Sequence, residues 1–237
     1  MNAERLATAV THLRPTERSD PPDSHALSAK VDGSASSLQD VDRVVDLAAI
    51  FEPSTSVVTL RRTPPSGLVH DAVGLARASG ARRFVIDPDT AAQTLDEELA
   101  GFPDLASDVG LWVQVLVDLT GCESVGVRIA LMPRPMCPRL HVDRVTLRLV
   151  VTYQGSGTEY VSNGHIDRRQ LGHPASGTAD EESGLLPSPD CVRRAGTYDV
   201  VLLKGEAWPD NVGRGAVHRS PPMSADSERL VMTLDPL

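Results

Sequence analysis

Two patterns of apolar residues divide the chain. In the first half, apolar residues recur every three to four positions, which is the spacing of an amphipathic helix. The predicted helices lie at 38–51, 64–80, 89–102 and 105–121, and short strands at 56–62 and 82–88. After Gly121 the pattern changes to short runs rich in β-branched residues, divided by glycine, proline and polar turns, which are typical of antiparallel strands. These runs are 124–132, 144–153, 157–161, 196–205, 215–220 and 228–235.

Two polar segments interrupt this pattern. Residues 1–37 contain few large apolar side chains, so burial cannot offset the entropy lost on ordering them, and we expect a disordered leader. Residues 165–194 are polar and too long for a simple turn, and we interpret them as an insertion or a lid. We therefore expect a single domain over 38–237, with helical support at 38–121 and a β core at 122–237. Helices followed by a block of strands indicate an α+β fold, with helices packed outside a β-sandwich or barrel.

Charge and composition exclude several classes of partner. The 237 residues include 23 Lys and Arg against 32 Asp and Glu, a formal net charge of −9. Because an acidic surface repels the phosphate backbone, we expect no nucleic-acid partner. The N-terminus mixes charges where a signal peptide needs an apolar stretch, and no run approaches the roughly 18 apolar residues of a membrane span. Three cysteines without a CxxC pair indicate neither a disulfide framework nor a zinc knuckle. We therefore expect a soluble, cytoplasmic protein.

A histidine and an aspartate lie two residues apart at the start of one β run. Residues i and i+2 of a strand point to the same face about 6 to 7 Å apart, so His141 and Asp143 can hold one metal ion. His218, on a later β run, is the candidate third ligand. Two imidazoles and one carboxylate leave the other side of the ion open, which is what non-haem Fe(II) needs to bind a chelating co-substrate and oxygen. The competing interpretation of an HxD motif is a hydrogen-bonded structural histidine.

Arg229 opens the last β run and is the candidate residue for binding a co-substrate. With a period of two, its side chain faces the same way as Val231 and Thr233, into a barrel. A buried guanidinium requires an anionic partner, which a dicarboxylic co-substrate would supply. The alternative is a surface arginine paired with Glu228 or Asp226.

Taken together, these residues resemble the pattern of Fe(II)/2-oxoglutarate oxygenases: HxD, a strand ending in an aromatic and a glycine turn, a distal histidine, then an arginine. The resemblance implies a double-stranded β-helix, or cupin-like jelly roll, in the C-terminal half. It also implies that His141, Asp143 and His218 bind Fe(II) and that Arg229 binds 2-oxoglutarate. Within TYQGSGTEYV, the resemblance makes Tyr153 a second co-substrate contact.

Several ordered blocks resemble a more specific family. The chain is similar, over about 38–237, to a bacterial family of unknown function, domain of unknown function 1826. The resemblance rests on the blocks CPRLHVD, LVVTYQGSGTEYV, LLKGEAWP, VHRSPP and RLVMTLD. It implies a metal context and a link to metal-chaperone GTPases, because genes of this family lie near zinc-responsive genes and genes for such GTPases. It implies no established activity.

Two residues depart from the oxygenase pattern and keep other functions open. Cys137 lies four residues before His141 and, with the three candidate ligands, would form a closed four-ligand zinc site. Lys204, inside an apolar run, is either an alternative anion-binding group or a lysine that extends to solvent from a strand end. The sequence thus supports three hypotheses: an Fe(II)/2-oxoglutarate-dependent dioxygenase, a zinc-binding protein (metal handling or hydrolase) on the same fold, and a non-catalytic β-sandwich interaction domain.

Overall fold

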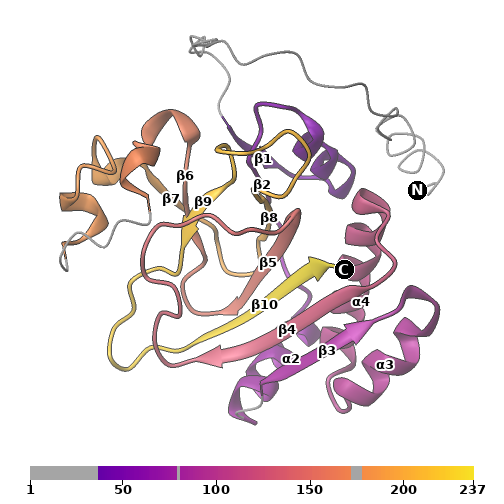
Figure 1. Ribbon diagram of the computed structural model, residues 1–237. Helices are drawn as coiled ribbons and strands as arrows, with labels where there is room; N and C mark the ends of the chain where they lie inside the picture. Colours follow the sequence, from indigo (N-terminus) through magenta and orange to yellow (C-terminus); the bar gives the residue numbers. More distant parts are fainter. Residues whose placement is uncertain (1–36, 79–80, 172–177) are drawn as a thin grey trace, which may run out of the picture.

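A seven-stranded sheet forms the centre of the protein (Figure 1). The computed structural model describes residues 37–78, 81–171 and 178–237, so the predicted leader, apart from Ser37, lies outside the described residues. The strand order is β1-β2-β8-β5-β10-β4-β3. The strands are β1 (Leu38–Val41), β2 (Val57–Leu60), β3 (Arg82–Ile86), β4 (Val125–Met132), β5 (Leu147–Gln154), β8 (Val200–Lys204) and β10 (Arg229–Pro236). Neighbouring strands are antiparallel except β1 and β2, which are parallel.

A second, three-stranded sheet packs against one face of the main sheet. Its strands, in the order β7-β6-β9, are β7 (Val192–Arg194), β6 (Glu159–Val161) and β9 (Val217–Arg219). Tyr160 of β6 belongs to one buried apolar cluster with Val150, Val201 and Val231 of the main sheet. This cluster joins the two sheets, and the candidate functional residues lie beside it.

Helices cover the opposite face of the main sheet. The α-helices are α2 (Ser66–Arg77), α3 (Ala91–Glu98) and α4 (Pro103–Thr120), and Figure 1 shows them beside β3, β4 and β10. Short 3-10 segments are η1 (Val44–Phe51), η2 (Pro88–Thr90), η3 (Asn163–His165), η4 (Arg168–Gln170), η5 (Asp180–Glu182) and η6 (Pro189–Cys191). Among the described helices, none has both the length and the apolar character that a membrane crossing requires.

The period of two along each strand assigns its side chains to one of these two layers. On β5, Leu149, Val151 and Tyr153 belong to the core cluster that includes the helices, whereas Val150 belongs to the cluster between the sheets. Arg148 has the same parity as Val150 and therefore points away from the helices. This alternation decides which strand residues can reach a site between the two sheets.

The prediction of a mixed α+β fold is confirmed, and most predicted elements are present. The helix predicted at 38–51 is wrong, because this segment forms strand β1 and the 3-10 helix η1. Leu38 to Val41 pair with β2 in register, and this long-range pairing overrides a local apolar spacing that suits a helix. Since β1, β2 and β3 all belong to the main sheet, the first half is not purely helical support. Strand β7 was not predicted and lies inside the segment interpreted as an insertion.

Asp71 provides a test of how the helical layer is stabilised. Its Oδ2 accepts hydrogen bonds from the backbone N–H groups of Asp104 and Leu105 at 2.7 and 3.1 Å, and α4 has no side-chain cap of its own. Asp71→Ala should therefore lower the free energy of unfolding by about 1 to 2 kcal/mol, measured by urea denaturation. The exposed Asp96→Ala serves as the control and should unfold at nearly the wild-type midpoint. Equal midpoints for the two variants would contradict the capping role.

Candidate metal centre

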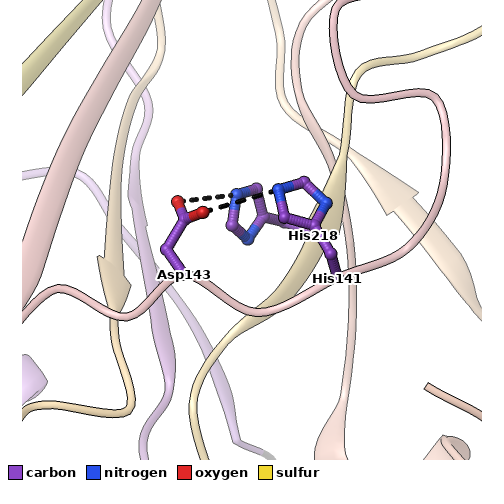
Figure 2. Close-up of side chains that lie close together, drawn as sticks. All are labelled: His141, Asp143 and His218. Carbon is purple, nitrogen blue, oxygen red and sulfur yellow. Dashed lines mark ion pairs between the residues drawn. The ribbon is translucent and has the colours of Figure 1, made fainter. Parts of the chain in front are cut away.

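His141 and His218 lie on neighbouring chain segments. The backbone N–H of each donates to the carbonyl of the other at 3.0 Å, forming an antiparallel bridge at the edge of the small sheet. His218 is the central residue of β9 and is paired with Tyr160 of β6. Figure 2 shows the carboxylate of Asp143, two residues after His141, facing both imidazole rings. The predicted trio is thus brought together by backbone pairing between segments far apart in the sequence.

Each of the three side chains presents a ligand atom to a common point. His141 Nε2 lies 3.5 Å from Asp143 Oδ1, and His218 Nε2 lies 3.3 Å from Asp143 Oδ2. The group's ligand atoms all lie within 4.8 Å of one another. On the far side of the rings, Nδ1 of His141 and Nδ1 of His218 lie 2.9 and 3.1 Å from the backbone carbonyls of Arg139 and Ala216. Because a carbonyl only accepts, each Nδ1 carries a proton, which leaves Nε2 of each ring for a cation.

Charge at this centre also favours a cation. Burial by itself would raise the pKa of the Asp143 carboxyl, but hydrogen bonds with His141 and His218 and the charge of Arg148 hold that pKa well below its usual range. The hydrogen bond with Asp143 raises the pKa of His141, although burial opposes this effect. Asp143 is therefore an anion at neutral pH, and a proton on an imidazole or a metal ion can balance its charge.

Arg148 holds the aspartate through Oδ2, the carboxylate oxygen that also faces His218. Its Nη1 donates to Asp143 Oδ2 at 2.6 Å, while Nε and Nη2 donate to the two carboxylate oxygens of Asp235 at 2.7 Å each. Since Arg148 is on β5 and Asp235 on β10, this bidentate pair fixes the guanidinium between two strands of the main sheet. Sequence reasoning missed both residues. The available signal was the same as for Lys204, a charged residue inside an apolar β run.

Arg148→Gln should weaken metal binding without removing a ligand. The variant keeps the charge of Asp143 but loses the group that orients it, and loss of such an outer partner costs roughly 10-fold to 100-fold in metal affinity. Titration against a chromophoric chelator measures the change. Arg144→Gln removes the same charge at an exposed position next to Asp143 and should keep wild-type affinity. An equal loss in both variants would mean that net charge, rather than orientation, determines affinity.

A buried ionic network supports the two histidines from behind. Asp180, which is 3% exposed, accepts the backbone N–H of Leu140 at 2.7 Å and lies 3.3 Å from Nη1 of Arg219. Leu140 directly precedes His141, and Arg219 directly follows His218. Arg219 also donates to two further carboxylates. The predicted insertion therefore contributes a buried carboxylate that positions both ligand-bearing segments, a role that its polar composition did not reveal.

A cavity of about 510 Å³ opens beside the metal ligands, and Arg229 lies in its wall. The Arg229 side chain is almost fully buried, and its Nε donates to the carbonyl of Ser156 at 2.6 Å. Its Nη2 lies 3.3 and 3.4 Å from the hydroxyls of Thr152 and Thr158. Burial lowers the pKa of Arg229 to about 10.

No carboxylate in the described part of the chain lies within 4.0 Å of the Arg229 guanidinium. The alternative of a surface ion pair with Glu228 or Asp226 is therefore wrong. A buried guanidinium without a close anion loses hydration, and the more distant charge of Glu159 offsets only part of this cost, since burial still lowers the pKa of Arg229. The cavity wall consequently presents a cationic group that a bound carboxylate would stabilise.

The other three candidate residues do not join the metal ligands. The Tyr153 hydroxyl donates to Asp108 of α4 at 2.8 Å. Its predicted co-substrate contact is wrong, because strand alternation directs the ring to the helical layer, whereas Thr152 contacts Arg229. Lys204 is buried, its Nζ donates to the carbonyl of Glu52, and burial lowers its pKa to about 8, so it neither reaches solvent nor lines the cavity. Cys137 is exposed and lines the cavity, but lies outside the group of facing ligand atoms.

A family model spans almost all of the described chain. The model of the family described as "Protein of unknown function (DUF1826)" matches residues 41–235. The chain belongs to this family. This agrees with the resemblance of the five ordered sequence blocks, which include both histidine motifs. A search of curated proteins finds no match to this family member.

The family member is also similar to solved structures at low sequence identity. The rice dioxygenase for auxin oxidation is 13% identical, with 84% of this chain and 82% of that chain covered and a TM-score of 0.48. A Pseudomonas putida prolyl-4-hydroxylase is 13% identical, with 81% and 98% covered and a TM-score of 0.47. The Arabidopsis thaliana dioxygenase for auxin oxidation 1, in complex with 2-oxoglutarate, is 12% identical, with 84% and 91% covered and a TM-score of 0.44.

Proposed function

We propose that this protein is a metal-dependent oxygenase of the Fe(II)/2-oxoglutarate type. One observation carries the proposal: a single cavity contains two histidines of a facing His-Asp-His trio and a buried arginine without a carboxylate partner. Metal ligands and an unpaired cation in one cavity suit a co-substrate that chelates a metal at one end and is anionic at the other.

The three ligand residues fit a metal ion bound on one side. Ligand atoms about 2.1 Å from a metal and at right angles to one another lie about 3 Å apart. The separations of 3.5 and 3.3 Å between the imidazole Nε2 atoms and the Asp143 oxygens are close to that value. His141, Asp143 and His218 would therefore hold the ion. When bound, Fe(II) would supply the open positions at which a 2-oxo acid and oxygen react.

Arg229 would bind the distal carboxylate of 2-oxoglutarate. Arg229 contacts Thr158, and Tyr160 is the strand partner of the metal ligand His218. Thr158 and Tyr160 are two residues apart, which is about 7 Å along the strand. A five-carbon dicarboxylate can bridge a separation of that size. The hydroxyl of Thr158, which lines the cavity, can donate a further hydrogen bond to the same carboxylate. In this assignment Thr158 takes the role that the sequence suggested for Tyr153.

The arrangement of strands supports a finer description of the fold. We assign β4, β10, β5 and β8 to the major sheet of a double-stranded β-helix, or cupin-like jelly roll. Strands β6, β7 and β9, together with the His141 segment, form the minor sheet. The metal ligands then lie at the edge of the minor sheet, facing the major one. Residues 38–237 form one domain in this assignment, and β1, β2 and β3 extend its major sheet.

Anaerobic spectroscopy tests the co-substrate assignment. Addition of Fe(II) and then 2-oxoglutarate to the full chain should give a visible charge-transfer band that neither addition gives alone. A folded, metal-loaded protein that shows no band would contradict the use of 2-oxoglutarate. The same titration with succinate, which lacks the chelating keto group, is the matched control and should give no band.

Zinc binding on the same fold is the competing hypothesis, because Cys137 lines the cavity. Elemental analysis of protein purified without added metal, compared with Cys137→Ala, separates the two. Stoichiometric zinc that is lost in the variant would favour a zinc protein, and unchanged iron binding would favour the oxygenase. A non-catalytic interaction domain instead predicts that His141→Ala and His218→Ala change neither metal content nor thermal stability.

A further inference from the structure

The cavity is unusually basic for a protein of net charge −9. Its lining includes one acidic side chain, that of Asp235, and five arginines, which are Arg83, Arg128, Arg148, Arg219 and Arg229. Two of these arginines are neutralised within the protein: Arg148 by Asp143 and Asp235, and Arg219 by carboxylates of the buried network. Arg83, Arg128 and Arg229 form no ion pair with any described residue. The proposed co-substrate accounts for Arg229 and leaves the other two unexplained.

Arg83 and Arg128 form a pair at one end of the cavity. They are direct partners across the antiparallel strands β3 and β4, so their side chains leave the same face of the sheet side by side. Like charges in this position repel each other, which destabilises the pairing unless an anion lies between them. Arg128 is half-buried, and its Nη1 has only the sulfur of Met136 as a hydrogen-bond partner. Arg83 is exposed at the edge strand.

The sheet register connects this pair to the metal ligands. Arg128 is opposite Thr233 of β10, and Thr233 is opposite Val150 of β5, so one row of cavity-lining residues crosses four strands. Two strand spacings, about 10 Å, separate Arg128 from Val150. Arg148, two residues before Val150 on the same face, holds the metal ligand Asp143. A small molecule lying along this row would therefore extend from the arginine pair toward the reacting centre.

The pair is also separate from the proposed co-substrate site. Thr233 of β10 is the strand partner of Arg128. Arg229 lies four residues before Thr233, so the Cα atoms of Arg229 and Thr233 are about 13 Å apart along β10. A five-carbon diacid held by Arg229 and the metal leaves the guanidinium groups of Arg83 and Arg128 free. Two guanidinium groups side by side suit a carboxylate or a phosphate, because each presents a fork of N–H donors to the oxygens.

We infer that Arg83 and Arg128 bind the anionic group, a carboxylate or a phosphate, of a small-molecule substrate whose remainder lies along the Thr233 and Val150 row. The assignment of this ligand as the substrate rests on the proposed function, whereas the anion site itself does not. The geometry assigns to the substrate a charged group at the end remote from the metal, so an uncharged analogue should bind poorly.

Calorimetric titration of the full chain with benzoate, phenyl phosphate and benzamide tests this site. Benzamide has nearly the shape of benzoate without its charge. Wild-type protein should bind at least one of the two anions roughly tenfold or more tightly than benzamide. The tighter of the two anions identifies the substrate group as a carboxylate or a phosphate. The double variant Arg83→Gln/Arg128→Gln should lose roughly tenfold or more in that affinity, whereas Arg229→Gln should retain it.

Two controls separate a specific site from a general charge effect. The double variant Arg43→Gln/Arg77→Gln removes two exposed arginines outside the cavity wall and should bind the anion like wild type. The single variants Arg83→Gln and Arg128→Gln, checked by thermal melting, cover the case in which the double variant misfolds. Benzamide binding equal to that of both anions, or unchanged anion binding in folded Arg83 and Arg128 variants, would overturn the inference.

The spectroscopic band distinguishes failure of this inference from failure of the proposed function. Arg83→Gln/Arg128→Gln should keep the band that Fe(II) and 2-oxoglutarate give with wild type, because neither residue belongs to the co-substrate site. If wild type gives no band but binds the anion through Arg83 and Arg128, the anion site stands and the oxygenase assignment falls. If the band is present and the anion is not bound, the oxygenase stands and the inferred substrate class is wrong.

Discussion

His218→Ala is expected to abolish stoichiometric metal binding and to lower metal affinity by at least about a hundredfold, more than loss of an outer partner costs. The substitution leaves two of the three protein ligands. Two ligands cannot fill one face of the ion, so water replaces them more easily. The backbone bonds that join β9 to β6 and to His141 do not involve the imidazole, so the fold should remain. Elemental analysis after dialysis, with a chelator titration for the affinity, measures the effect.

The control for this variant is His165→Ala, which removes an exposed histidine of η3 outside the group of metal ligands. It should bind metal like wild type. Metal should also raise the melting temperature of wild type and His165→Ala but not of His218→Ala, because a ligand stabilises only the folded state that binds it. Full metal occupancy in folded His218→Ala would show that this histidine is structural.

Arg229→Gln is expected to weaken 2-oxoglutarate binding by roughly 100-fold to 1000-fold while leaving metal binding intact. A bidentate pair between a guanidinium and a carboxylate in a water-poor cavity contributes about 3 to 4 kcal/mol, and glutamine replaces it with one neutral hydrogen bond. The measurement is anaerobic titration of the Fe(II)-loaded protein with 2-oxoglutarate. Arg229→Lys, which keeps the charge but not the planar fork, should have an intermediate affinity.

Thermal stability provides a second readout for Arg229 that separates binding from structure. Without co-substrate, Arg229 is 2% exposed and has no carboxylate partner among the described residues, so burial of its charge opposes folding. Arg229→Gln should therefore melt close to wild type in the absence of ligand. At a concentration that just saturates wild type, 2-oxoglutarate should stabilise metal-loaded wild type and have little effect on metal-loaded Arg229→Gln. A large loss of stability in the ligand-free variant would instead assign Arg229 a structural role.

Much of the fold followed from local patterns. The helices α2 and α4 and the β runs of the second half were predicted because a helical face or an alternating strand leaves its period in the sequence. The helix predicted at 38–51 failed because apolar spacing is a local signal, whereas β1 exists only through its pairing with β2. The direction in which the Tyr153 side chain points could not be predicted either, since it depends on which face of the sheet the helices cover.

The amino-acid sequence by itself determined the His-x-Asp motif, the later histidine and the arginine at the head of the last strand, since these are residue identities at strand spacing. Only the tertiary structure decided which charged groups meet. Arg148 contacts Asp143 and Asp235, and Arg83 lies beside Arg128. Asp180 supports both histidine segments. These contacts form because strand pairing brings together residues that are far apart in the sequence. The burial of Arg229 away from any close carboxylate likewise results from the packing of the two sheets and not from the sequence near Arg229.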